Sequence, residues 1–196
     1  FRSDIYSNAP FVYGATFRSE APQLFEAFME NIVQKHKVRD VFHIRSDDAK
    51  ELTDVNSAMT ALFNKYNIRI RDKTAPYSSS HQNSRAERMI LQLSVTSRAM
   101  RSFSGAPKNE WFSSLEYAAF IIRLMPTKSN PNYESPLTRL GIQKQPLRAS
   151  LIKTYYTRVY YVDRTPKSYR FEEQSRAGYF IGYLSHLNRS EEHTSE

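Results

Sequence analysis

The sequence predicts an α/β domain followed by a small β-rich module. Up to residue 145, short segments rich in β-branched and aromatic residues alternate with segments whose apolar residues recur at helical spacing. After Pro146 this spacing stops, and tyrosine- and valine-rich segments typical of strands follow. The composition, 40% hydrophobic and 24% charged among 196 residues, indicates a globular chain.

The first predicted elements are two strands and a helix. Residues 9–17 are rich in aromatic and β-branched side chains and predict a strand. Ser19 as a cap, Pro22 in the first turn and a helical apolar pattern predict a helix over residues 20–36, packed on a sheet. Residues 38–44 predict a second short strand.

The middle of the chain predicts two further helices. The first covers residues 55–66 and precedes a short strand over 68–70. Residues 73–83 are polar and contain Pro76, which predicts a loop. A long helix follows over residues 85–103, and its expected buried side chains are Ile90, Leu91, Leu93, Val95 and Met100.

The last third of the chain completes the prediction. Trp111 and Phe112 are expected to anchor the next helix. The predicted elements are a helix over 110–125, a connector over 126–136, a short helix over 135–141, and strands over 155–162 and 178–183.

Charge and cysteine content narrow the classes of function. The chain has 28 Lys and Arg against 20 Asp and Glu, a net charge of +8, which indicates an anionic partner such as nucleic acid. Zero cysteines exclude a disulfide scaffold, a cysteine-ligated zinc site and thiol catalysis, and they favour an intracellular location. No apolar run approaches the length of a membrane span, so no membrane partner is expected.

Two carboxylates are candidates for phosphoryl-transfer chemistry. Asp47 follows a predicted strand, and Glu87 begins a predicted helix after a polar loop. Two or three carboxylates so placed supply the hard oxygen ligands that Mg²⁺ or Mn²⁺ needs. From the residues alone, the alternative is that Asp47 is a turn residue and Glu87 a solvated helix residue.

The segments around these two acids carry a family resemblance. Residues 44–52 read I-R-S-D-D-A-K-E-L and residues 82–88 read Q-N-S-R-A-E-R. They resemble the second and third acidic motifs of copia-type LTR retrotransposon integrases. Further segments resemble that family in the same order: Tyr6-Ser7, Val12-Tyr13, residues 17–20, residues 74–77, Trp111 with Ala118 and Ala119, residues 135–137, residues 153–155 with 158–160, and residues 178–183.

The resemblance implies an RNase H-like integrase core lacking its first strand over residues 1–145, and a small β-rich module over 146–188. Asp47 and Glu87 would be two of three catalytic carboxylates, holding Mg²⁺ or Mn²⁺ for DNA integration by phosphoryl transfer. The DNA partners would be the element ends and the target, a homo-oligomer is left open, and the parent integrase would be nuclear. The family's first Asp, in a D-x-x-G-P segment, has no counterpart in these residues, so we expect this chain to be an inactive polyprotein fragment.

The motifs also depart from the family pattern. Where the family has N-G-G after its second Asp, this chain has Asp48, Ala49 and Lys50, and Ser84 stands where glycine precedes the third motif. Side chains at these positions restrict positive φ and close backbone approach. A non-catalytic remnant that binds nucleic acid is therefore the alternative function.

Polar and basic residues around Glu87 are candidate DNA ligands. Gln82 and Asn83 are expected to position a DNA strand, and Arg85 and Arg88 to contact its phosphates. Arg98 and Arg101 continue the basic series along the same helix, and the alternative is an ordinary solvated face.

Four C-terminal tyrosines have two interpretations. Packing in a small β core is favoured over base stacking, because their positions alternate. These residues are Tyr155, Tyr156, Tyr160 and Tyr161.

The last eight residues, 189–196, differ from all that precede them. They read R-S-E-E-H-T-S-E and resemble a translated sequencing-library adapter, with an acidic disordered terminus as the alternative. We leave them out of the predicted fold.

Overall fold

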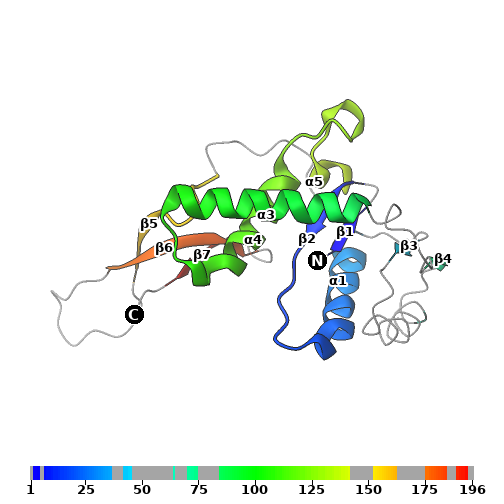
Figure 1. Ribbon diagram of the computed structural model, residues 1–196, viewed down its shortest axis with the longest axis horizontal. Coiled ribbons are helices and arrows are strands. Elements are labelled where there is room, and N and C mark those ends of the chain that lie inside the picture. Colours follow the sequence, from blue (N-terminus) through cyan, green and yellow to red (C-terminus); the bar gives the residue numbers. More distant parts are fainter. Residues whose placement is uncertain are drawn as a thin grey trace.

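The computed structural model describes nine parts of the chain, and these contain helices and strands in mixed order (Figure 1). The long helix α3 and its neighbour α4 lie at the centre, with the N-terminal elements at one end and the last three strands at the other. The described residues are 2–4, 7–36, 42–45, 64, 70–74, 84–141, 152–162, 175–184 and 189–193.

The chain begins with an antiparallel hairpin. Strand β1 (Arg2–Asp4) pairs with strand β2 (Ala9–Phe11) across a turn in which Asn8 has a φ of 61°. The predicted strand over 9–17 is therefore too long, because it ends at Phe11. Beyond it the backbone crosses α4: a Cβ on Gly14 would come within 2.7 Å of the Phe112 ring. Glycine, which has no Cβ, allows this close approach.

Helix α1 (Ala21–His36) follows a short 3₁₀ turn, η1 (Arg18–Glu20). The predicted helix is confirmed, and its apolar side packs on β2. The Phe28 ring meets the Phe11 ring edge-on at 5.3 Å, and Phe25 is buried.

A second, separate strand pair lies beyond α1 (Figure 1). Strand β3 (Phe42–Arg45) pairs in parallel with strand β4 (Ile70–Thr74). Strand β4 extends into the segment predicted as a loop from residue 73. The predicted helix over 55–66 lies outside the described residues, except for Asn64, which is helical.

Helices α3 (Ser84–Ser104) and α4 (Trp111–Leu124) form the core of the described structure. Helix α3 ends at Gly105, whose φ of 69° lets the Ala106 amide donate to the Arg101 carbonyl at 3.1 Å, a Schellman-type ending. The two helices meet through Leu93 and two alanines of α4. A buried hydrogen bond joins their serines, with Ser97 Oγ 2.7 Å from Ser114 Oγ.

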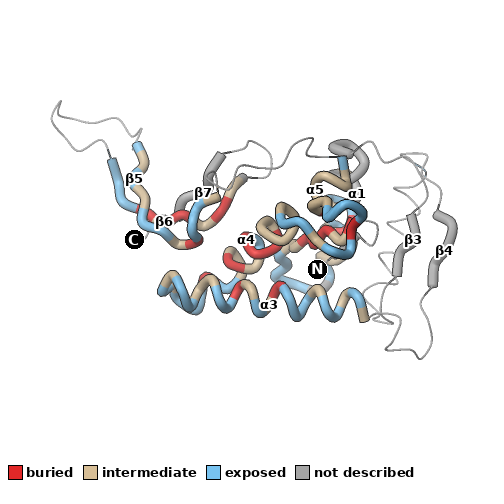
Figure 2. Tube along the Cα trace, turned by 90° about the horizontal axis from the view of Figure 1, so that it is seen from above, coloured by how far each residue is buried: buried red, intermediate tan, exposed pale blue. Residues whose placement is uncertain are grey.

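Two predictions about burial on these helices are wrong. On α3 only Leu93 of the five expected apolar residues is buried, and Ile90, Leu91 and Val95 are exposed. Helix α4 covers the face carrying Leu93 and Ser97, and Leu91 and Val95 lie on the opposite face (Figure 2). Ile90 lies on the same stripe as Leu93 and Ser97, one turn nearer the start of α3, and is still 46% exposed. Trp111 does not anchor α4, because 57% of its surface is exposed.

The connector after α4 is fastened to the N-terminal hairpin by Asn130. This buried amide donates to Ser7 O at 3.0 Å and to Glu134 O at 3.1 Å, and it accepts from Asn8 Nδ2 at 2.8 Å. Two short turns complete the segment, η4 (Pro131–Tyr133) and helix α5 (Pro136–Arg139), the latter capped by the Ser135 hydroxyl.

The C-terminal sheet packs on the other end of α4. It comprises β5 (Arg158–Val162), β6 (Ser175–Leu184) and β7 (Arg189–His193), all antiparallel. Its core is Tyr155, Phe180 and Tyr117 of α4, whose hydroxyl donates to the Lys153 carbonyl. Burial raises the pKa of both tyrosines.

Strand β7 lies inside the tail that we left out of the predicted fold. It pairs with the edge of β6 through the backbone, with Leu184 opposite Arg189. An open strand edge accepts any extended segment, so this pairing depends little on the side chains of the tail.

The described residues thus form a mixed α/β structure with three small sheets of two, two and three strands. The coarse fold class predicted from the sequence is confirmed.

Candidate nucleic-acid interface

The candidate interface is built on the first turns of α3. No glycine or proline occurs between residues 84 and 104, and arginine, leucine, methionine and alanine favour the helix. Glu87 lies exposed in the first turn, where its negative charge is favourable to the helix dipole by about 0.3–1 kcal/mol.

Two cations share this turn with Glu87. The side chains of Arg85 and Arg88 are exposed, and both lie at the positive end of the helix dipole, where a cation is unfavourable. A position that breaks a local stability rule points to a role outside folding. The helix dipole and the two exposed guanidinium groups together make this end of α3 attractive to an anion.

The Arg88 side chain folds back on the start of the helix. Its Nε donates to Ser84 O at 3.2 Å, and its Nη2 lies 3.5 Å from Ser84 Oγ. Ser84 thus places a hydroxyl beside the Arg88 side chain. Because Arg88 uses Nε and Nη2 in these contacts, its Nη1 side is the one left to face a phosphate.

The basic character continues along the outer face of α3. Arg88 and Arg98 are exposed and bracket the exposed side chains Leu91 and Val95, all at successive three- and four-residue intervals. The two arginines are separated by about 15 Å of helix rise. The pale outer edge of α3 in Figure 2 traces this exposed face.

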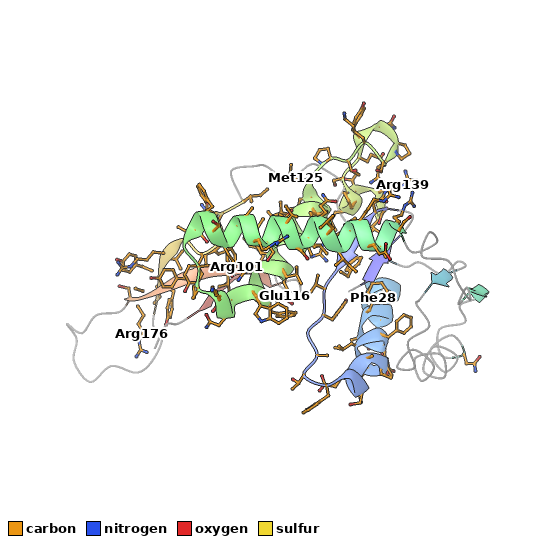
Figure 3. All side chains as sticks on the ribbon, viewed as in Figure 1. Phe28, Arg101, Glu116, Met125, Arg139 and Arg176 are labelled. Atoms are coloured by element: carbon orange, nitrogen blue, oxygen red, sulfur yellow. The ribbon has the colours of Figure 1, made fainter. Side chains whose placement is uncertain are left out.

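Arg101 differs from the other arginines of the series. It is half-buried, its Nη1 donates to Lys108 O at 3.3 Å, and its Nε is buried without a hydrogen-bond partner among the described residues. Figure 3 labels it on α3 near the C-terminal end of the helix. Arg101 thus belongs to the α3–α4 junction rather than to the exposed basic face.

The structure brings together three of the six predicted site residues. Glu87, Arg85 and Arg88 lie within one turn of α3. Asp47, which follows β3 in the sequence, and Gln82 and Asn83, which precede α3, lie outside the described residues.

The residues described around Glu87 do not by themselves make a metal site. Mg²⁺ and Mn²⁺ need several hard oxygen ligands, and Glu87 supplies one carboxylate. Within the described ranges no three His, Cys, Asp or Glu side chains come close enough to hold a metal ion. The chemistry that these residues support is anion binding.

Comparisons with known proteins provide no family assignment for the chain. No protein-family model, curated protein or solved structure matches the chain. In the part of the chain that the structure describes, no helix has the length and apolarity needed to cross a bilayer.

The sequence did not single out two features of this region. The exposed aliphatic pair Leu91 and Val95 was assigned to the core, and the back-bonding of Arg88 to Ser84 was not foreseen. The helical spacing could have indicated that Leu91 and Val95 are exposed. Residues 88, 91, 95 and 98 repeat at intervals of three and four, so Leu91 and Val95 share a face with Arg88 and Arg98, opposite Leu93.

Proposed function

We propose that the chain is a fragment of a copia-type retrotransposon integrase that binds DNA and does not catalyse integration by itself. The observation that supports it is the first turn of α3, where two exposed arginines sit at the positive end of a 21-residue helix beside Glu87. Its chemical class would be metal-dependent phosphoryl transfer, on an RNase H-like core.

The DNA-binding part of this proposal rests on charge. Each phosphate contact that an arginine makes releases counterions, so the affinity falls steeply with salt. Arg85 and Arg88 would hold the phosphates of one strand at the helix start, and Arg98 would extend the contact along α3. Gln82 and Asn83 directly precede this turn and would contact the same strand.

The metal and the catalytic step belong to the proposal alone. Asp47 and Glu87 would be ligands of Mg²⁺ or Mn²⁺, and these 196 residues hold no counterpart of the family's first Asp. A bound pair of ions would polarise the phosphodiester and activate the attacking hydroxyl. With two carboxylates in place of three, we expect no strand transfer.

The binding test measures duplex DNA affinity against salt. We expect Arg88→Gln to weaken binding to a fluorescent DNA duplex and to reduce the slope of log K against log salt by about 1. Lys128→Gln, an exposed lysine on the connector after α4, is the matched control and should leave both unchanged. Equal affinity and slope for Arg88→Gln and the wild type would contradict the proposal.

The catalytic test separates the two functions left open by the sequence. We expect no Mn²⁺-dependent strand transfer on oligonucleotide ends. Salt-sensitive DNA binding that is the same in Asp47→Asn would favour the non-catalytic remnant. Robust strand transfer that Glu87→Gln abolishes would instead show that the chain is an active enzyme.

A further inference from the structure

The outer face of the C-terminal sheet carries exposed aromatic and basic side chains. The sheet has two faces, because side chains alternate along each strand. Val159 and Phe180 pack toward α4, whereas Arg158, Tyr160 and Val162 are exposed on the other face of β5. Tyr160 is the largest of these, and 68% of its surface is exposed.

The strand register places Tyr179 on the same face. Tyr179 is directly opposite Arg158, and the neighbouring pairs set Tyr160 against Ala177 and Val162 against Ser175. Because the residues opposite Tyr160 and Val162 are small, β6 leaves these two side chains uncovered. Tyr160 and Tyr179 are diagonal neighbours, about 7–8 Å apart by ordinary sheet geometry.

Tyr156 reaches this face from the turn before β5, and it also packs against the core cluster of Tyr117, Tyr155 and Phe180. The Tyr156 ring stacks on the Tyr179 ring at 4.3 Å with an angle of 5° between the planes. Tyr156 has a φ of 59°, a left-handed conformation that costs a bulky residue of order 1 kcal/mol or more. Two backbone hydrogen bonds hold the turn to β6: Tyr156 N to Phe180 O at 2.7 Å and Phe180 N to Thr157 O at 2.9 Å.

The face also carries positive charge. The Arg158 guanidinium carbon lies over the Tyr160 ring, 5.4 Å from the ring centroid, within the reach of about 6 Å of a cation–π contact. Figure 3 shows Arg176 projecting at the start of β6, at the end of the sheet far from α1. We call the four residues Tyr156, Arg158, Tyr160 and Tyr179 the aromatic face.

We propose that the aromatic face binds single-stranded nucleic acid by stacking unpaired bases on Tyr160 and on the Tyr156–Tyr179 pair, with Arg158 at a phosphate. Exposed rings beside a guanidinium on an open sheet are the arrangement that stacks bases without sequence preference. Paired bases inside a duplex are stacked on each other and do not present their faces to such rings. The proposal does not depend on the interface at α3, to which we assign phosphate contacts.

The test uses the full chain and two 12-nucleotide probes, one of thymidine and one abasic, which carry the same phosphates. We expect the wild type to prefer the thymidine probe, and Tyr160→Leu to weaken its binding by about 5- to 150-fold while leaving the abasic probe unchanged. Phe17→Leu is the matched control, because Phe17 is 67% exposed and lies beside α1.

Three results would overturn the proposal. The first is equal binding of both probes by the wild type, and the second is a Tyr160→Leu affinity equal to that of the wild type. The third is sedimentation showing that Tyr160→Leu dissociates a dimer, which would make this face a protein interface. If the circular dichroism of Tyr160→Leu shows that this variant is unfolded, the test uses Arg158→Gln instead. A reduction of about 1 in the slope of log K against log salt for the thymidine probe would support the proposal, and an unchanged slope would refute it.

Discussion

Replacing Asn130 by alanine tests the link between the N-terminal hairpin and the connector after α4. The Asn130 amide makes three hydrogen bonds, to Ser7 O, Glu134 O and Asn8 Nδ2, at 3.0, 3.1 and 2.8 Å. Two of them span more than 120 residues of sequence, as the separations of 122 and 123 show. The side chain is buried, so water does not readily replace these bonds.

The expected loss in the free energy of unfolding follows from the number of hydrogen bonds that Asn130 makes. At about 0.5–1.5 kcal/mol net for each bond, the three contribute about 1.5–4.5 kcal/mol to the free energy of unfolding. A loss of about 3 kcal/mol lowers Tm by about 6–12 °C for a domain of this size. The loss should be found mainly in the hairpin, because Ser7 and Asn8 form its turn.

Urea unfolding followed by circular dichroism measures the change, with Asn109→Ala as control. Asn109 is exposed in the 3₁₀ turn η3 (Lys108–Glu110), and its replacement should change the free energy by less than about 0.5 kcal/mol. If Asn130→Ala were no less stable than Asn109→Ala, the hydrogen bonds of Asn130 would not hold the connector, and the argument would fail.

Two further predictions concern the core. Ser97→Ala and Ser114→Ala should show a coupling of about 0.5–1.5 kcal/mol in a double-mutant cycle of urea unfolding, because their hydroxyls share one buried bond; additive effects would refute it. Burial raises the pKa of Tyr117 above its ordinary value of 10.0, so the folded state keeps a proton that the unfolded state releases. The contribution of the protonated Tyr117 hydroxyl to the free energy of unfolding is therefore fully present below pH 10.0 and is lost as the pH rises through the folded-state pKa. Tyr117→Phe should therefore make the free energy of unfolding fall less steeply with pH above 10.0. An unchanged pH slope in Tyr117→Phe would contradict this.

The helices could be predicted from the sequence because the signals are local. The predicted helix over 20–36 is found at 21–36, the one over 85–103 at 84–104, and the one over 110–125 at 111–124. Helical spacing, a glycine after the last turn and prolines near the ends act within a few residues, so no knowledge of the partners is needed.

Which face of each element is buried could be predicted less well from the sequence. Ile90, Leu91 and Val95 are apolar and lie on a helix, but only the position of α4 decides that Leu93 is covered and that they are exposed. Among the four C-terminal tyrosines, Tyr155 is in the core as favoured, whereas Tyr160 is exposed. Tyr155 lies in the turn before β5, where its hydroxyl donates to the Glu110 carbonyl, whereas the pairing of β5 with β6 places Tyr160 on the outer face. Both positions depend on contacts with distant residues.

By itself, the sequence determined the α/β class, the main helices and the net positive charge of the chain. The tertiary structure decided that Arg88 and Arg98 share the exposed side of α3 while Arg101 is half-buried at its C-terminal end. It also decided that Tyr156, Tyr160 and Tyr179 gather on one sheet face. Composition and spacing are properties of neighbouring residues, whereas burial and register are created by contacts between residues far apart in the chain.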